Sequence, residues 1–290
     1  MHRDKLKALL AGTGVTKAPG VYDGLSALLV EQAGFDLCFF SGGSYSFARH
    51  GRPDMGLVSM SEVADAVAII RERINIPMLV DMDTGFGNAL NVQRTVRLFE
   101  RAGASALQME DQVSPKRCGH MAGKDVIPAA EMAGKIKAFL DARESADTLL
   151  AARTDALGVN GFEDALERGH LYLEAGADMI FIEAPQSIEQ MQRISAEFSN
   201  TPLVHNLVEG GHSPVSSATE LEALNYRIAL YPVALLHRFM PEAQSLLAHI
   251  HKQGDTSSFD KPLFDLNDTN ALLGADDLLD VSDRYGPDDN

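Results

Sequence analysis

Short apolar runs of four to seven residues alternate along the chain with longer segments in which apolar positions recur every three or four residues. The short runs predict buried strands, and the longer segments predict amphipathic helices. Eight strands are expected, at residues 17–21, 36–41, 77–83, 106–111, 149–154, 179–184, 203–207 and 228–232. Helices are expected between them, among others at 61–73, 88–101, 129–143, 162–174 and 188–198. Eight such units predict a closed (β/α)8 barrel of the TIM type with a parallel sheet.

Three of these helices end on the same two residues, Ala33-Gly34, Ala102-Gly103 and Ala175-Gly176. A glycine in this place is typical of a left-handed helix C-terminus, and its recurrence supports a repeated strand-helix unit. No linker interrupts the pattern before its end. We therefore expect residues 1–254 to form the barrel, and residues 255–290 to form an acidic, helical C-terminal extension that packs on the barrel or on a neighbouring subunit.

The composition is that of a soluble globular protein with a sizeable core, since 45% of the 290 residues are hydrophobic. The formal net charge of -16 argues against nucleic acid as a partner, and residues 255–290 carry half of it. No apolar run approaches the roughly 20 residues that span a membrane. The N-terminus has no signal-peptide pattern, and two cysteines are too few for a disulfide scaffold. We expect a cytoplasmic protein without a membrane partner.

Acidic residues gather where the third and fourth predicted strands end. Asp81 and Asp83 are two residues apart, so on an extended strand they point to the same side, and Glu110 ends the next strand. The carboxyl ends of the strands form the active-site face of such a barrel. Like charges about 4 Å apart repel by roughly 4 kcal/mol at an effective dielectric of 20. The carboxylates therefore predict a bound cation, and oxygen ligands without a histidine pair favour Mg²⁺ or Mn²⁺.

An alternative is that these acidic residues cap the helices that follow them. For Asp111, next to Glu110, we prefer this capping role. For Asp81 and Asp83 we prefer the metal, because Gly85 and Gly87 follow at once and indicate an open loop.

The segment from Pro115 to Lys124 places a thiol among cations. Lys116, Arg117 and His120 flank Cys118 and favour its thiolate, so we expect Cys118 to exchange protons with the substrate. An ordinary surface cysteine in a basic loop is the alternative. The neighbouring glycines predict a loop that closes over the site as a lid. Cys38, within an apolar strand, is expected to lie in the core.

Further donors complete the same rim. Arg153 ends the fifth strand and is expected to clamp a carboxylate through two parallel hydrogen bonds. The Ser41-Gly42-Gly43 turn ends the second strand and offers backbone N–H groups to an anion. Glu183 and Asn206 follow the sixth and seventh strands, where a capping or solubilising role is the alternative for each.

Six phrases occur in one order along the chain: Ser41-Gly42-Gly43, Asp81 to Gly87, Glu110-Asp111-Gln112, Lys116-Arg117-Cys118-Gly119-His120, Ala152 to Asp155, and Asn206 to Gly211. Together they resemble the isocitrate lyase and phosphoenolpyruvate mutase superfamily, over about residues 19–236. Lyases of that superfamily carry the cysteine phrase, whereas the phosphonate mutases have another loop without it. The segment from Asn206 to Pro214 is similar to 2,3-dimethylmalate lyases and plant 2-alkylmalate lyases, with methylisocitrate lyases as the alternative.

The resemblance implies a role for each matching residue. Asp81 and Asp83 would hold Mg²⁺, partly through water, with Glu110 and Asp54 nearby. Ser41, Gly42, Gly43 and Arg153 would bind the carboxylate of the oxo acid. Cys118 would protonate the departing carbon, with Lys116 in the same loop, and Gly119, His120, Glu183 and Asn206 would support the second carboxylate and the closed loop. The family also implies a homotetramer that exchanges C-terminal helices between neighbours.

The implied reaction cleaves a dicarboxylate, a 2-hydroxy diacid such as a 2-alkylmalate, to pyruvate or another 2-oxo acid and a carboxylic acid. A hydroxide on the metal, Tyr22 and Tyr45 are candidates for the base, with packing as the alternative for both tyrosines. Oxaloacetate hydrolase shares such a site and stays an alternative. A Schiff-base aldolase is disfavoured because Lys17 opens its strand instead of ending it. One methylene in an apolar pocket changes binding by only about 1 to 3 kcal/mol, so the alkyl groups stay open, with Val233 and Leu235 as candidates to line their pocket.

Overall fold

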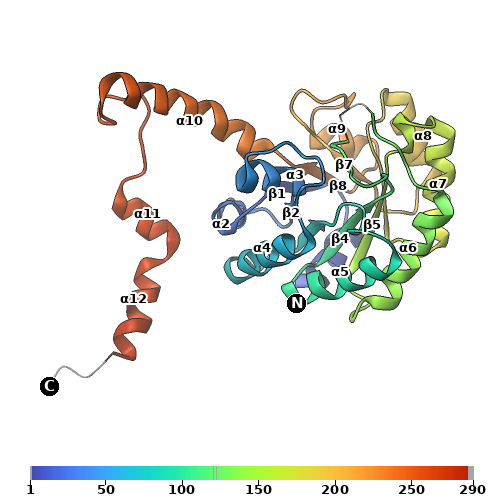
Figure 1. Cartoon of the computed structure of the whole chain (residues 1–290), viewed down its shortest axis with the longest axis horizontal. Coiled ribbons are helices and arrows are strands. Elements are labelled where there is room, and N and C mark those ends of the chain that lie inside the picture. The colour runs from blue at the N-terminus through green and yellow to red at the C-terminus, as the bar shows by residue number, and fades with distance from the viewer. Residues whose placement is uncertain (1, 120, 122, 287–290) are drawn as a thin grey trace. The chain divides into compact units, whose positions relative to one another are not determined.

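The computed structural model describes residues 2–119, 121 and 123–286. The chain divides into two compact units, Met1–Arg238 and Phe239–Asn290. The first unit holds the barrel, with its strands inside and helices around them (Figure 1). The strands are β1 (Thr16–Val21), β2 (Cys38–Phe40), β3 (Met78–Asp81), β4 (Ala106–Glu110), β5 (Leu149–Thr154), β6 (Met179–Ile182), β7 (Val204–Asn206) and β8 (Ile228–Tyr231).

Neighbouring strands pair in the order β6-β5-β4-β3-β2-β1-β8-β7, and every pairing is parallel. A parallel bridge between Ile180 and Leu203 joins the two ends of this sheet. The strands therefore form a nearly closed barrel, which confirms the predicted (β/α)8 fold. Each of the eight predicted ranges overlaps the strand at its place in the order.

The helices connect the strands. They are α1 (His2–Ala11), α2 (Gly24–Gln32), α3 (Gly42–Tyr45) with a π-helical turn (Ser46–His50), α4 (Met60–Arg73), α5 (Ala89–Ala102), α6 (Ala129–Ala142), a 3₁₀ turn (Ala156–Gly158), α7 (Phe162–Glu174), α8 (Ile188–Glu197), α9 (Ala218–Ala223) and α10 (Ala234–Gln253). Ser59 caps α4 in a reciprocal pair with Glu62. Gly34, Gly103 and Gly176 have φ angles of 81°, 105° and 109°, which confirms the left-handed helix ends.

Alternation along the strands divides the core into two layers. Leu79 and Leu149 belong to a cluster inside the barrel, whereas their neighbours Val80 and Leu150 face the surrounding helices. Leu6 of α1 joins the inner cluster and is 1% exposed, so α1 covers the N-terminal end of the barrel. The sequence pattern did not predict this helix. The carboxyl ends of the strands are left to build the site.

The second unit, Phe239–Asn290, contains most of α10 together with α11 (Leu266–Leu273) and α12 (Ala275–Arg284). It begins within α10, and the functional boundary expected after residue 254 stays a prediction. All side chains of α11 and α12 are at least partly exposed, and Phe264, Leu266 and Leu278 are 68%, 75% and 67% exposed. In the described part of the chain, no helix is both long and apolar enough to cross a membrane.

Candidate active site

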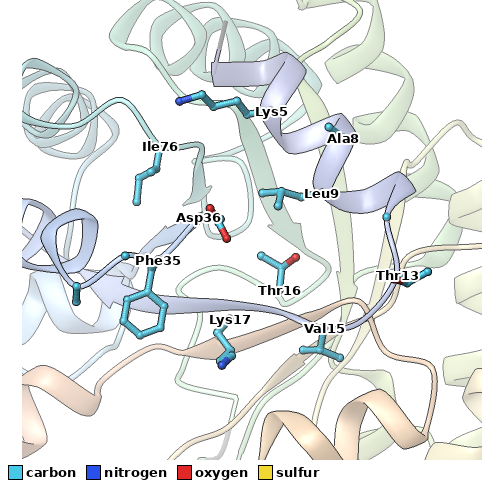
Figure 2. A pocket seen from close by; sticks show the side chains of 13 residues that line it. Lys5, Ala8, Leu9, Thr13, Val15, Thr16, Lys17, Phe35, Asp36 and Ile76 are labelled. Carbon is cyan, nitrogen blue, oxygen red and sulfur yellow. The ribbon is translucent and has the colours of Figure 1, made fainter.

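A narrow cleft of about 60 Å³ lies at the carboxyl ends of the strands. Its lining combines acidic, basic, thiol and apolar residues: Phe39, Ser41, Gly43, Phe47, Asp54, Asp81, Gln108, Lys116, Cys118, Gly119, Arg153, Asn206, Val208, Pro232 and Val233. A roomier hollow of about 760 Å³ lies beside α1 and the start of β1, with Lys5, Lys17 and Asp36 on its wall (Figure 2). Those three charged side chains are exposed. Asp81, Lys116 and Arg153 in the narrow cleft are buried, so this cleft is the candidate site.

Asp81 and Asp83 reach the cleft by a different route from the one the sequence indicated. Strand β3 ends at Asp81, and Asp83 lies beyond it in a left-handed conformation with a φ of 49°. Asp81 Oδ1 accepts the backbone N–H of Asp83 at 3.1 Å, which fixes this turn. Both carboxylates converge beside Gly42, where a Cβ would lie 3.0 Å from Asp81 Oδ2 and 3.5 Å from Asp83 Oδ1. The absent side chain at Gly42 thus leaves room next to the two acids.

Lys116 from the cysteine loop enters this acidic group. Its Nζ atom lies 2.7 Å from Asp54 Oδ1 and 2.8 Å from Asp83 Oδ1, and its side chain is 4% exposed. Burial raises the pKa of Asp83 to about 6, with Lys116 acting against the rise and Asp81 adding to it. At this carboxylate, burial thus outweighs the neighbouring lysine.

Glu110 and Arg153 meet at the ends of β4 and β5. Arg153 Nη1 lies 3.3 Å from Glu110 Oε2, yet neither oxygen of Glu110 accepts a hydrogen bond from a described residue. Burial raises the pKa of Glu110 well above its usual range, although Arg153 opposes this rise. The glutamate is therefore a buried acid with unused acceptor capacity.

Asp155 holds one edge of the Arg153 guanidinium. Arg153 Nε and Nη2 donate to Asp155 Oδ2 and Oδ1 at 2.9 Å and 3.1 Å. Burial works against ionisation of Asp155, but the charges of Arg153 and Lys124 outweigh it and lower its pKa to about 2. The other guanidinium edge, formed by Nη1 and Nη2, has Glu110 beside Nη1 and is the edge at which the predicted carboxylate clamp would have to act. The sequence pattern did not predict that Asp155 occupies part of Arg153.

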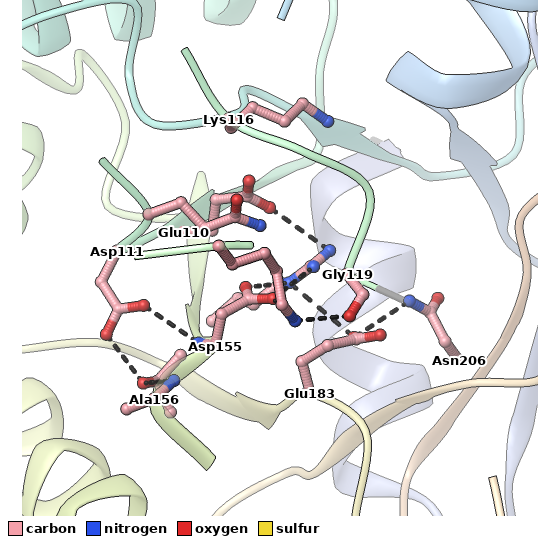
Figure 3. Close-up of polar contacts among 12 residues, drawn as sticks. Glu110, Asp111, Lys116, Gly119, Asp155, Ala156, Glu183 and Asn206 are labelled. Carbon is pink, nitrogen blue, oxygen red and sulfur yellow. Dashed lines mark hydrogen bonds and ion pairs between the residues drawn. The ribbon is translucent and has the colours of Figure 1, made fainter. Parts of the chain in front are cut away.

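Glu183 approaches the same Nε atom of Arg153 that Asp155 binds, and Asn206 is bonded to Glu183. Asn206 Nδ2 donates to Glu183 Oε2 at 3.2 Å, and Arg153 Nε lies 3.8 Å from the same oxygen. Figure 3 shows Glu110, Asp155, Glu183 and Asn206 on neighbouring strand ends, with Gly119 approaching from a separate loop. The structure thus brings these sequence-predicted residues together around one arginine.

The cysteine loop lies over the strand ends. A bridge between Gln112 and Val126 closes its base, and the backbone N–H of Cys118 donates to the carbonyl of Asp54 at 3.1 Å. Gly119 packs so closely that a Cβ there would lie 2.3 Å from Arg153 Nη2 and 2.7 Å from Glu183 Oε1. Cys118 lines the cleft. His120 lies outside the described residues.

Ser41, Gly42 and Gly43 form the start of a helix where the sequence indicated a simple turn. Ser41 is the N-cap of α3, and its Oγ accepts the backbone N–H of Ser44 at 3.2 Å. Gly42 and Gly43 make the first turn, and Ser41 and Gly43 line the cleft.

The preferred capping role of Asp111 was wrong. Its carboxylate is 0% exposed and accepts bonds from Thr154 Oγ1, Tyr172 Oη and Arg168 Nη1 at 2.7, 2.7 and 3.1 Å. The next helix, α6, is capped by Pro128 far along the chain. Asp111 instead joins β4 to β5 and α7.

Three smaller expectations, on two tyrosines, two residues of the alkyl pocket and Cys38, have different outcomes. Tyr22 and Tyr45 line a separate hollow with Arg49 and Glu62 and are absent from the cleft lining, so neither is placed to act as the base. Val233 lines the cleft, whereas Leu235 packs against the outer core. Cys38 is 0% exposed in the core, as predicted.

A barrel with buried carboxylates, an arginine and a thiol loop at its carboxyl strand ends is equipped to act on small anionic substrates. The family model described as phosphoenolpyruvate phosphomutase matches residues 6–251. The 2,3-dimethylmalate lyase of Eubacterium barkeri is 40% identical over 281 residues, covering 97% of each chain. The 2-methylisocitrate lyase of Aeropyrum pernix is 40% identical over 272 residues, covering 94% of this chain and 87% of that one.

Solved structures agree with these relatives. An oxaloacetate acetylhydrolase in complex with 3,3-difluorooxalacetate matches with a TM-score of 0.93 at 31% identity, covering 100% of this chain and 98% of that one. A phosphonopyruvate hydrolase in complex with oxalate and Mg²⁺ matches with a TM-score of 0.88 at 31% identity, covering 98% and 99%. The chain belongs to the phosphoenolpyruvate mutase/isocitrate lyase superfamily. Its similarity to two named lyases identifies it as a carbon-carbon lyase.

Proposed function

We propose that this lyase cleaves the bond between C2 and C3 of a 2-alkylmalate, such as 2,3-dimethylmalate, to a 2-oxo acid and a carboxylic acid with the aid of Mg²⁺. The observation that carries this proposal is that Cys118 lines the same cleft as Asp81 and Arg153. A proton donor, an acidic group and a carboxylate clamp thus share one small space. The 40% identity to a 2,3-dimethylmalate lyase supports this substrate class.

The acidic residues fit a divalent cation. Six carboxylates, those of Asp54, Asp81, Asp83, Glu110, Asp155 and Glu183, face three described cations, Lys116, Lys124 and Arg153, a formal excess of three negative charges. Among the described residues, no three His, Cys, Asp or Glu side chains form a ready metal cage. The support for Mg²⁺ comes from the surplus of carboxylates, since this ion keeps several waters and takes only one or two protein carboxylates. Asp81 and Asp83 would hold the ion beside the space at Gly42, with Glu110 and Asp54 nearby. Mn²⁺ is the alternative ion.

When bound, the ion would supply a Lewis acid that lowers the pKa of the substrate hydroxyl. The chain's own residues would do the remaining work. Ser41, Gly42, Gly43 and the outer edge of Arg153 would bind the carboxylate next to the hydroxyl. A base would take the hydroxyl proton, and the C2–O bond would become a carbonyl as the C2–C3 bond breaks. The electron pair of that bond stays on the departing carbon, and the Cys118 thiol would give this carbon a proton. The resulting thiolate would regain a proton before the next turnover, so that no proton is gained or lost overall. Lys116 would balance the acidic group from the loop side, and Gly119, His120, Glu183 and Asn206 would hold the second carboxylate.

The apolar part of the lining favours a substrate with alkyl groups. Phe47, Val208 and Val233 line the cleft together with its charged residues, and apolar walls gain free energy when they exclude water against methyl or ethyl groups. Oxaloacetate has no alkyl group to place there. Its hydrolysis is nevertheless the second candidate, because the oxaloacetate acetylhydrolase structure matches over the whole chain.

A substrate panel tests the proposal. The purified protein is incubated with Mg²⁺ and 2,3-dimethylmalate, 2-methylisocitrate or oxaloacetate, and the release of each 2-oxo acid or of oxalate is measured. We expect 2,3-dimethylmalate to give the highest kcat/KM, EDTA to abolish the reaction and added Mg²⁺ to restore it. Faster oxaloacetate hydrolysis, or a rate that EDTA does not change, would contradict the proposal.

We also propose that the protein is a homotetramer whose C-terminal helices are exchanged, with residues 1–254 as the catalytic barrel and 255–290 as the exchanged extension. The exposed Phe264, Leu266 and Leu278 support this proposal, because apolar patches of this kind mark contact surfaces. Light scattering should give four times the 31.3 kDa mass of one chain. Deletion of residues 255–290 should lower the number of chains per particle below four. A monomer of full length would refute it.

A further inference from the structure

Lys124 connects two parts of the site that are distant in sequence. Its Nζ atom lies 2.8 Å from Asp155 Oδ1 and also donates to the backbone carbonyl of Gly119. The side chain is 8% exposed. Lysine is rarely buried unless it is paired, because its ammonium group loses hydration. The two contacts are therefore what keeps this side chain inside the protein.

Asp155 is a firm anchor for the lysine. It is 0% exposed and holds Arg153 with two hydrogen bonds, and its backbone N–H donates to Asp111 Oδ1 at 3.0 Å. Gly119 belongs to the cysteine loop and follows Cys118 directly. Lys124 thus ties the loop, one residue from the thiol, to the rigid end of β5.

The loop has a second buried lysine, with a different set of partners. Lys116 pairs with Asp54 and Asp83, which are also residues that we assign to the cation. Asp155 lies outside that assignment, so the Lys124 contact does not share its partner with the ion. Of the two lysines, Lys124 is the one with no bond to a residue that we assign to the cation.

We propose that Lys124 is a positioning residue that holds the cysteine loop closed, with Cys118 over the cleft, by bridging Asp155 and the Gly119 carbonyl. The catalytic part of this inference rests on the proposed lyase function, whereas the holding of the loop does not. Lys124 acts on the reaction only through Cys118 and Gly119.

Lys124→Met tests the bridge, because methionine keeps an apolar stem of similar length and removes the ammonium group. Lys137→Met, at an exposed position on α6, is the matched control. We expect kcat of Lys124→Met to fall roughly 10²-fold, as for a misplaced catalytic group. Its KM should stay within about threefold of the wild-type value, because Arg153 keeps its bonds to Asp155. Damage to the substrate-binding edge of β5 would instead raise KM.

Hydrogen exchange supplies a readout that does not depend on activity. Peptides that contain Lys116 to Gly119 should exchange faster in Lys124→Met, whereas β5 peptides and the Lys137→Met protein should match the wild type. If thermal melting shows that Lys124→Met does not fold, Lys124→Gln, a neutral donor, is measured in the same two assays and should give intermediate changes. Unchanged loop exchange in the folded variant would overturn the proposal. A wild-type protein inactive on every diacid, with faster loop exchange in the variant, would refute the lyase function and leave the bridge standing.

Discussion

The close packing of Gly119 predicts that Gly119→Ala disables the enzyme without unfolding it. The added Cβ would lie 2.3 Å from Arg153 Nη2, against the 3.4 Å at which ordinary contacts begin, so one of the two must move by about 1 Å. Arg153 is not free to move, since both of its bonds to Asp155 are buried. The φ angle of Gly119 is not in the positive range, so the backbone itself accepts alanine.

The loop is therefore the part that shifts. A displacement of about 1 Å at a catalytic group costs roughly 10²-fold in rate, and Cys118 is the neighbouring residue. The assay is 2-oxo acid release from the best substrate of the panel, with thermal melting on the same samples. Gly134→Ala is the matched control, because Gly134 belongs to α6 and a Cβ added there would meet nothing within 4 Å. There alanine should stabilise the helix by about 0.5 to 1 kcal/mol.

This prediction fails if the Gly119→Ala enzyme keeps kcat/KM within about twofold of the wild-type value. It also fails if this variant loses as much thermal stability as a core substitution, because the loop would then belong to the folded core and not to the site.

Three further predictions follow from other contacts. Cys118→Ser should lower kcat by more than about tenfold, since serine is a much weaker acid, with an unchanged circular dichroism spectrum; an unchanged rate would remove the acid role. Asp111→Ala should lower the free energy of unfolding in urea by about 3 kcal/mol, because Arg168 and Tyr172 lose a buried partner; a loss below about 1 kcal/mol would contradict this. The lowered pKa of Asp155, about 2, should add about 2 kcal/mol of stability, fully present above pH 4 and lost as the pH falls through 2; urea unfolding between pH 5 and 2.5 should show a flatter pH dependence for Asp155→Asn than for the wild type.

The barrel could be predicted from sequence because each buried strand leaves its own local mark. A run such as Leu149 to Thr154 is apolar or small for several residues, and the next helix starts after a turn, so period and length suffice. Helix α1 left no such mark. Half of its ten residues are polar and Leu6 alone is buried, so its packing against the barrel depends on tertiary contacts.

The sequence could predict those site residues whose place in the fold follows from their position at the end of a strand. Asp81 and Glu110 end their strands and Arg153 is the last but one residue of β5, and a barrel gathers strand ends at one face. Other contacts around the site join residues that are far apart in sequence. Asp111 bonds to Tyr172 across 61 residues, and Lys124 bonds to Asp155 across 31. A lysine at the end of a loop and an aspartate after a strand have the same sequence signature whether they are solvated or buried together. Only the fold distinguishes the two cases.

The charges explain why loop closure and cation binding belong together. Without the loop, six carboxylates would face Arg153 alone, a formal excess of five negative charges. Lys116 and Lys124 reduce that excess to three when the loop lies over the strand ends. A divalent ion would reduce it to one, and a dicarboxylate would return it to three. A dianionic substrate therefore cannot be accommodated at reasonable electrostatic cost by the barrel alone. Lys116 enters the cleft with the thiol and would supply the part of this balance that the substrate meets, because the charge of Lys124 is taken up by Asp155.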